Sequence, residues 1–275
     1  MSRRILVVVS EFGYWGEELV DPLEALDAAG YACEFATPRG RRPVALPPSL
    51  DPEFVDPPLG RRVTTPDMAA KVRALEASTR LAEPLSLAAL LPERPYTSAA
   101  AYLRALETYH RELERVKAER LAAYDALLIV GGSGPIVDLA NNGRVHDVVL
   151  SFLERDRPIA ALCYGVACLA FARSWEDRRS ILWGKHVTGH CKEYDYKAGT
   201  GFVGVDFDMG PPPYPLEYVL RDATGPDGGY HGNFGRETSV VVDHPFITGR
   251  STSDSLLTGL KLVEVMERGL RRWGW

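Results

Sequence analysis

The sequence is poor in cysteine and contains no long apolar run. Only 4 of its 275 residues are cysteine, and no two of them stand in the C-x-x-C spacing common to metal sites and redox motifs. The apolar run in the opening M-S-R-R-I-L-V-V-V-S spans only five residues, fewer than a secretion signal or a membrane-spanning helix requires. These absences argue against a disulfide-stapled scaffold and predict a cytoplasmic protein that does not enter a membrane.

An excess of positive charge is also missing. The chain has 32 Lys and Arg against 37 Asp and Glu, which gives a formal net charge of −5. Because proteins that bind nucleic acids usually carry a basic excess, we expect no nucleic-acid partner, and we interpret the R-G-R-R cluster at residues 39–42 as a solvated loop. The sequence also lacks internal repeats and low-complexity tracts. A chain of this length holds one large domain, or one domain with an insertion.

What the chain does contain is an alternation of apolar runs and helical segments. Residues 5–9 form a continuous apolar run typical of a strand covered on both faces. Residues 17–29 place leucines at helical spacing, and residues 31–37 then alternate like a second strand. Later segments are a strand at 124–130, a hairpin around 185–207, a strand at 239–242 and a final helix at 255–271. This order predicts an α/β fold with a doubly wound, mostly parallel sheet, flavodoxin-like, and helices on both faces.

The alternation is interrupted between about residues 41 and 122. Proline pairs there alternate with Ala-, Leu-, Arg- and Glu-rich stretches, and no strand pattern is apparent. The clearest helix, at residues 98–123, places one apolar face on Leu103, Leu106, Tyr109, Leu113 and Val116. We interpret residues 41–122 as a helix-rich insertion, a lid or cap, within a single α/β domain of residues 1–275. The alternative is a cap that only enlarges the core.

The segment R-P-I-A-A-L-C-Y-G-V-A-C-L-A at residues 157–170 is the most informative. A strand that turns into a helix within a few residues holds its turning residue in a strained conformation, and Gly165 permits close backbone approach. Cys163 would stand at that turn, near the positive end of the following helix, where the pKa of a thiol falls. The spacing equally allows a buried structural cysteine at a strand end.

Two other strand ends would lie beside Cys163, since reactive groups gather at the carboxyl ends of parallel strands. The first strand is followed by S-E-F-G-Y-W-G-E-E, which offers Glu11, Glu17 and Glu18. The strand at residues 124–130 runs into G-G-S-G-P, and the backbone N–H of Gly132 there, with that of Tyr164, would form a two-donor oxyanion hole.

Together these motifs resemble the ThiJ/PfpI (DJ-1/PfpI) superfamily, the cysteine branch of the class I glutamine amidotransferase-like fold. The resemblance rests on Glu18 four residues before Pro22, G-G-S-G-P-I-V-D-L at residues 131–139, A-L-C-Y-G at 161–165 and H-P-F-I-T-G-R-S-T-S-D-S at 244–255. It covers nearly the whole chain outside the insertion. It implies that Cys163 is the nucleophile and that Glu18 is a buried, protonated carboxyl that donates a hydrogen bond or moves a proton.

One position departs from the pattern of many enzymatic members, which have histidine directly after the cysteine. Here that position is Tyr164, a poor base at neutral pH. The segment K-H-V-T-G-H at residues 185–190 resembles one that supplies a histidine in members lacking the elbow histidine, so His190 is the candidate base, with Glu193 and Asp195 near enough in sequence to orient it. The alternative is that His190 is an ordinary histidine at a strand end.

Further candidates rest on weaker signals. Four aromatic residues cluster near the predicted strand ends and would line an apolar pocket: Trp15, Trp183, Tyr194 and Tyr196. His231 lies in a Gly-rich loop able to fold over it. Cys191 adjoins His190 but has no second ligand pair, so we predict no metal, and no motif indicates another cofactor.

The resemblance implies a cysteine-dependent enzyme that acts on a small electrophilic, carbonyl-type compound as a glyoxalase-like hydro-lyase, a hydratase or a hydrolase, and possible homodimers. A glutamine amidotransferase proper is disfavoured because no His-x-Glu pair follows Cys163. Two alternatives stay open: a redox-sensing or chaperone-like stress protein that uses Cys163 oxidation, and a binding module that keeps the elbow as a relic.

Overall fold

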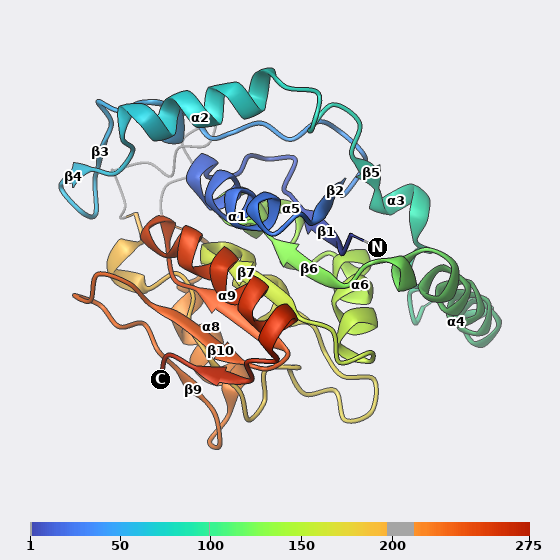
Figure 1. Cartoon of the computed structure of the whole chain (residues 1–275). Helices are drawn as coiled ribbons and strands as arrows, with labels where there is room; N and C mark the ends of the chain where they lie inside the picture. The colour runs from blue at the N-terminus through green and yellow to red at the C-terminus, as the bar shows by residue number, and fades with distance from the viewer. Residues whose placement is uncertain (1, 99, 197–211) are drawn as a thin grey trace.

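A computed structural model describes residues 2–98, 100–196 and 212–275 of the chain. Within these residues, eight strands form one central sheet in the order β12-β10-β11-β7-β6-β1-β2-β5 (Figure 1). Its strands are β1 (Arg4–Val8), β2 (Ala32–Thr37), β5 (Leu85–Ser86), β6 (Ala126–Ile129), β7 (Ile159–Leu162), β10 (Val240–Asp243), β11 (Phe246–Gly249) and β12 (Arg272–Trp273). Two small sheets pair β3 (Val55–Asp56) with β4 (Arg61–Arg62), and β8 (His186–Val187) with β9 (Gly229–Tyr230).

The central sheet is mostly parallel, which confirms the predicted fold class. From β5 through β2, β1, β6 and β7 to β11 every neighbouring pair is parallel, and only β10 runs antiparallel to β11 and β12. The carboxyl ends of β1, β6 and β7 therefore meet at one edge of the sheet. Within the described residues, no helix combines the length and apolar composition that crossing a membrane requires.

Helices cover both faces of this sheet (Figure 1). They are α1 (Gly16–Ala28), α2 (Pro66–Ala77), α3 (Leu87–Leu90), α4 (Tyr102–Glu119), α5 (Gly134–Asp138), α6 (Gly143–Leu153), α7 (Ala167–Phe171), α8 (Leu216–Thr224) and α9 (Ser255–Arg268). Short 3₁₀ helices lie at Pro47–Leu50, Leu121–Ala123, Cys163–Val166, Lys192–Tyr194 and Thr252–Asp254.

The described residues form two hydrophobic cores, one on each face of the central sheet, because successive side chains along a strand point to opposite faces. On β1, Ile5 and Val7 point into one core, which they share with α1, α2 and α9, whereas Leu6 and Val8 point into the other, with α4, α6 and α7. All four side chains are fully buried, which explains why the strand reads as a continuous apolar run.

Helix α1 presents Glu18 at the carboxyl edge of the sheet and packs beside α9 on the same face of the sheet (Figure 1). Leu19, Leu23 and Leu26 are buried between α1 and the sheet, at the spacing that predicted this helix. Between the two helices, a Cβ at Gly259 of α9 would stand only 2.7 Å from Pro22 Cα, so glycine there permits them to touch.

The region of residues 41–122 differs from the prediction in two ways. It contains strands, since β5 extends the central sheet and β3 pairs with β4. In α4 the buried side chains are those of Tyr109, Leu113, Val116 and Lys117, while Leu103 is 78 % exposed and does not belong to the apolar face. Leu103 lies in the first turn of the helix, where its side chain is exposed to solvent.

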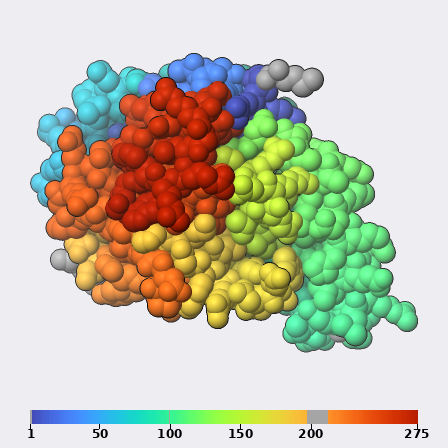
Figure 2. Space-filling view, turned by 60° about the horizontal axis from the view of Figure 1, so that its bottom comes forward, coloured from blue at the N-terminus to red at the C-terminus, as the bar shows by residue number. Residues whose placement is uncertain are grey.

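The parts of this region lie far apart. Figure 1 shows the β3–β4 hairpin at one side of the molecule and α4 at the other, and in Figure 2 the green segment that contains α4 forms a projecting lobe. Only the hairpin end of residues 41–122 is therefore placed where a lid over the carboxyl edge of the sheet would be.

The predicted hairpin around residues 185–207 is not found in the described part of that segment, and residues 197–211 lie outside the described residues. Instead, β8 pairs in parallel with β9, which comes more than forty residues later. The backbone N–H of His186 donates to Asp243 on β10, and the N–H of Thr188 donates to Thr248 on β11. These bonds hold residues 186–188 against the main sheet. The partners of this segment are therefore strands from distant parts of the sequence and not the other arm of a local hairpin. Helix α8 was not predicted.

Candidate active site

Cys163 occupies the sharp turn after β7. Its φ is 52°, a left-handed conformation rarely adopted by residues other than glycine, and it opens the 3₁₀ turn Cys163–Val166 that leads into α7. Two residues on, a Cβ at Gly165 would stand 2.9 Å from the carbonyl oxygen of Val130, so only glycine lets the turn press against the end of β6. The strained strand-to-helix turn predicted from the sequence is present.

The glycine pair after β6 packs directly against this turn. A Cβ at Gly131 would stand 2.1 Å from Oε2 of Glu18 and 2.5 Å from the carbonyl oxygen of Leu162, and Gly132 has a φ of 90°. The backbone N–H groups of Gly132 and Tyr164 both donate to the sulfur of Cys163. Two amides therefore converge at the nucleophile, which is the geometry that a developing oxyanion beside the sulfur would need.

Glu18 is buried beside Cys163. Only 1 % of the residue is exposed, and burial raises the pKa of its carboxyl to about 8, although hydrogen bonds with Cys163 and with the amide of Gly132 partly oppose this. Its Oε2 makes no hydrogen bond within the described residues. At neutral pH the carboxyl is mostly protonated, so it can donate a hydrogen bond or a proton, the state that the family resemblance implied.

The pKa of Cys163 does not follow the expectation from the sequence. We expected the following helix to lower it, but burial and the neighbouring Glu18 raise it, and the amides of Gly132 and Tyr164 only partly compensate. Helix α7 has only five residues, so its dipole is small. Cys163 therefore rests as a thiol and needs a base to become a nucleophile.

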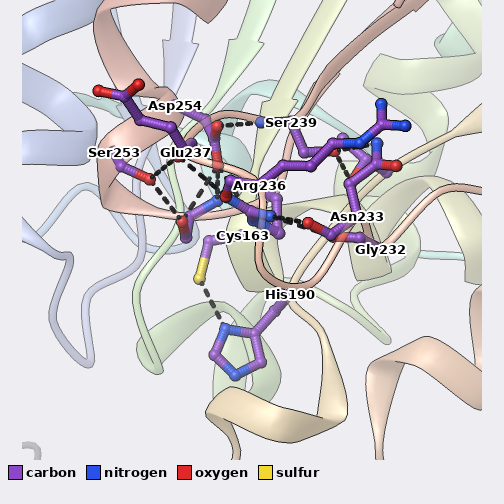
Figure 3. A network of polar contacts seen from close by, with 12 residues as sticks. Cys163, His190, Gly232, Asn233, Arg236, Glu237, Ser239, Ser253 and Asp254 are labelled. Carbon is purple, nitrogen blue, oxygen red and sulfur yellow. Dashed lines mark hydrogen bonds and ion pairs between the residues drawn. The ribbon is translucent and has the colours of Figure 1, made fainter. Parts of the chain in front are cut away.

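His190 is the side chain placed to act as that base. Its Nδ1 lies 3.4 Å from the sulfur of Cys163, and the two side chains point toward each other (Figure 3). On the far side of the ring, Nε2 lies 3.2 Å from Oδ1 of Asp195 without forming a regular hydrogen bond. The structure thus brings a thiol, an imidazole and a carboxylate into line, as in nucleophilic hydrolases.

Tyr164, which stands where many family members have histidine, contacts both His190 and Asp195. Its ring stacks on that of His190, with centroids 4.0 Å apart and planes 24° apart, and its hydroxyl donates to Oδ1 of Asp195 over 2.5 Å. Tyr164 therefore holds the imidazole of His190 and its carboxylate partner Asp195 in place. It is a positioning residue as well as the source of one amide donor.

We expect two substitutions of Tyr164 to separate these roles. Tyr164→Phe keeps the stacked ring and loses the bond to Asp195, so alkylation of Cys163 by iodoacetamide at pH 7 should slow about threefold. Tyr164→Leu also loses the ring, and the rate should fall about tenfold further. Mass-spectrometric labelling rates measure both, at matched urea stability. Equal rates for the two variants would mean that the stack does not position His190.

A cavity of about 210 Å³ opens at this site. Cys163, Glu18, His190, Gly132, Tyr164, Trp15 and Tyr194 line it, as the sequence predicted for each of them. Tyr196, which the sequence grouped with the aromatic residues near these strand ends, lines it as well. The sequence did not indicate the other lining residues: Leu46, Asp56, Leu59, Arg61, Arg62 and Val63 from the insertion, Ser133, and Ser251, Thr252 and Ser253 after β11, while Glu17 was noted only as a nearby carboxylate. The late motif at residues 244–255 was the one available signal for the three hydroxyl residues.

Arg250 anchors the loop that carries these hydroxyls. It is only 1 % exposed, and its guanidinium donates to the carbonyl oxygens of Gly232, Asn233, Arg236 and Glu237. Asp254, which accepts from the backbone N–H of Ser239, closes the same network on the side of Cys163 (Figure 3). This network fixes the position of Ser251, Thr252 and Ser253, which line one side of the cavity.

Other predicted residues lie outside the cavity lining. Trp183 is 39 % exposed and lies under Arg179, and His231 bonds through Nε2 to Nδ1 of His186 over 2.8 Å. The predictions that these two line the pocket are therefore not supported. Glu11 accepts from the backbone N–H groups of Arg39 and Arg41 and so fixes a loop. Among the described residues, no cluster of three or more His, Cys, Asp or Glu side chains is arranged to hold a metal ion.

The fold and this site define an α/β protein with a cysteine elbow and a buried partner glutamate. A family model described as "ThiJ/PfpI family-like" matches residues 9–200, so the chain belongs to that family, as the resemblance indicated. The bovine (Bos taurus) protein "Glutamine amidotransferase-like class 1 domain-containing protein 1" is 31 % identical over 135 residues, which are 49 % of this chain and 56 % of the bovine protein. The match thus spans only about half of that relative.

Solved structures show the same fold at lower identity. The Rapid Encystment Protein 24 kDa of Francisella tularensis is 18 % identical with a TM-score of 0.67, over 96 % of this chain and 99 % of that one. Glyoxalase III of Candida albicans is 14 % identical with a TM-score of 0.65, over 97 % and 98 % of the two chains. At these identities the likeness concerns the fold alone.

Proposed function

We propose that this protein is a cysteine-dependent enzyme that acts on a small electrophilic, carbonyl-type compound. The observation that carries the proposal is the contact of 3.4 Å between the sulfur of Cys163 and Nδ1 of His190, at a cavity that Glu18 also lines. A purely structural cysteine needs neither a base nor a cavity. The relative named glyoxalase III supports the carbonyl class as an analogy of fold.

The first step of the reaction follows from these contacts. His190 Nδ1 removes the thiol proton, and the sulfur of Cys163 forms a bond to the carbonyl carbon while the C=O π bond breaks. The electron pair moves onto the oxygen, which the N–H groups of Gly132 and Tyr164 hold. Glu18, protonated at neutral pH, donates its proton to that oxygen and gives a neutral thiohemiacetal.

In the second step His190 gives up the proton that it took from the thiol, and Glu18 regains the one that it donated. Ionised Glu18 takes the proton of the hydroxyl group, the C=O bond re-forms, and one other bond to that carbon breaks with its electron pair leaving on the departing group. The imidazolium of His190 protonates that group, and where the departing group is not the sulfur, neutral His190 then takes a proton from a water molecule whose oxygen displaces the sulfur from the carbon. The addition is shared by glyoxalase-like hydro-lyases, hydratases and hydrolases, and the substrate decides which breakdown follows. Asp195 stabilises the imidazolium in each case, since it lies 3.2 Å from Nε2.

Site-selective labelling followed by a substrate screen tests this proposal. At pH 7, iodoacetamide should modify Cys163 faster than Cys33, Cys168 or Cys191, because His190 lies 3.4 Å from the sulfur of Cys163 and can take its proton. Burial raises the pKa of the other three thiols, and none of their sulfurs is hydrogen-bonded to a histidine within the described residues. Aldehydes, amides and isocyanides are then screened, with Cys163→Ala as the inactive control. Labelling of Cys163 no faster than of Cys33 would contradict the proposal.

A redox-sensing role is the competing function that one observation favours. The protonated Glu18 and the amides of Gly132 and Tyr164 would also stabilise a sulfinate formed on Cys163. Oxidation of Cys163 by peroxide, together with no turnover in the screen, would support this role over the enzymatic one.

A further inference from the structure

The mouth of the cavity carries two arginines from the β3–β4 hairpin. Arg61 and Arg62 both line it, although they belong to the insertion and not to the sheet that holds Cys163. Arg62 already has a counter-ion, because its guanidinium pairs with Glu53, which lies outside the cavity lining. Within the described residues, the guanidinium of Arg61 makes no ion pair and donates no hydrogen bond, although Asp56 lies near enough to interact with it electrostatically. Arg61 is therefore the lining arginine whose N–H donors can bind a ligand.

Among the acidic groups that line the cavity, Asp56 is the one that interacts electrostatically with Arg61, and it does so without forming an ion pair among the described residues. The other acidic residues described in the lining are Glu17 and Glu18. Burial raises the pKa of Glu17 and of Glu18 to about 8, so both are mostly neutral at pH 7. Asp56, opposite Arg61 in the hairpin register, accepts from the backbone N–H of Leu59 and from the hydroxyl of Tyr196.

The rest of the lining is apolar or carries hydroxyl groups. Leu46, Leu59 and Val63 supply apolar surface on the hairpin side, and Ser251, Thr252 and Ser253 supply hydroxyls on the opposite wall. A cavity of about 210 Å³ admits only a small compound. Its chemistry therefore fits a short molecule with one anionic end.

We propose that the substrate carries a carboxylate, which Arg61 binds while the reacting carbonyl carbon stands at the sulfur of Cys163. This inference rests on the proposed function and adds the substrate class, a small oxo acid. A guanidinium presents two parallel N–H donors that match the two oxygens of a carboxylate. One unpaired guanidinium suits a single negative charge better than the double charge of a phosphate.

Two alkylating agents that differ by one carboxylate test the assignment. Iodoacetate and iodoacetamide are nearly equal in size, and the measured quantity is the ratio of their rates at Cys163, at constant ionic strength. Arg61→Gln should lower this iodoacetate-to-iodoacetamide ratio about tenfold, whereas Arg61→Lys should retain part of it. Arg115→Gln, on the exposed face of α4, removes a charge far from the cavity and should leave the ratio unchanged.

Competition separates a carboxylate site from a phosphate site. Propionate should slow iodoacetamide labelling of Cys163 in the wild type and lose this protection in Arg61→Gln, and inorganic phosphate should protect only at higher concentration. Protection by phosphate at lower concentration than propionate would overturn the carboxylate class. A drop in the ratio for Arg62→Gln but not for Arg61→Gln would overturn the residue assignment.

The failure of this inference is distinct from failure of the proposed function. If Cys163 reacts selectively with iodoacetamide but the ratio is the same in Arg61→Gln and the wild type, the carboxylate site is wrong while the cysteine chemistry stands. If Cys163 reacts with neither reagent faster than Cys33, the proposed function fails, and the substrate class falls with it.

Discussion

Replacing His190 by alanine should slow alkylation of Cys163 by iodoacetamide at pH 7 about a hundredfold. The physical reason is that burial and Glu18 raise the pKa of the thiol, so almost none of it is ionised unless a base takes the proton. His190 Nδ1, 3.4 Å from the sulfur, is the described group placed to do so. The measurement is the rate of modification of Cys163 across pH 6–10, with the site assigned by mass spectrometry.

His231→Ala is the matched control for this prediction. His231 is also a partly buried histidine in the same half of the chain, but it bonds to His186 and does not line the cavity. We expect its removal to leave the labelling rate of Cys163 within twofold of the wild type. The reverse order, a large effect for His231 and a small one for His190, would move the base to the Gly-rich loop.

The pH dependence separates loss of a base from loss of structure. Without His190, labelling should recover at high pH, where hydroxide ionises the thiol directly, so the two curves should converge. A variant whose cavity had collapsed would stay slow at every pH. Persistent slowness at pH 10 would therefore contradict the assignment of His190 as the base.

The elements that the sequence predicted well are those whose signal is local. Continuous apolar runs such as residues 5–9 indicate a strand buried on both faces, and the leucine spacing of residues 17–29 indicates a helix. Cys163, Gly131 and Gly132 were found because a tight turn needs particular residues at particular places. Such features are encoded within a few residues, so one sequence suffices.

The elements that the sequence missed depend on distant partners. The strands β5 and β8 have two residues each and exist only because β2 and β9 pair with them. Leu103 was assigned to an apolar face by its spacing, yet its side chain, in the first turn of α4, is exposed. Arg61 and Asp56 reach the cavity through the path of the insertion, which periodicity cannot reveal. The sequence gives no reason for a tyrosine at position 164, because the partner of its ring, His190, comes from a different segment of the chain.

Glu18→Gln should make the folded protein more stable at pH 8 and leave its stability at pH 5 little changed. In the folded state the pKa of Glu18 is raised from 4.5 to about 8, because its carboxyl is buried. Between these two values the folded chain keeps a proton that the unfolded chain releases, so the free energy of unfolding falls as pH rises, by up to about 1.4 kcal/mol per pH unit. Above pH 8 the loss is complete.

Glutamine cannot ionise and escapes this cost. Its amide lacks a full set of partners in the buried site at every pH, so this cost cancels when the two pH values are compared. We expect the stability of Glu18→Gln relative to the wild type to rise by about 3 kcal/mol from pH 5 to pH 8. Urea unfolding at both pH values measures it. Glu107→Gln, at an exposed position on α4, is the control that changes a carboxyl to an amide without burial.

Glu18→Asp distinguishes the proton from the shape of the side chain. It keeps a buried ionisable carboxyl, so the fall in stability from pH 5 to pH 8 should persist, while the shorter side chain loses contact with Cys163. Both variants should lose turnover on the substrate found by screening, because neither returns a proton to the bound oxygen. If the difference in free energy of unfolding between Glu18→Gln and the wild type were the same at pH 5 and pH 8, Glu18 would be ionised in the folded protein. The proton donor in the proposed reaction would then have to be another group.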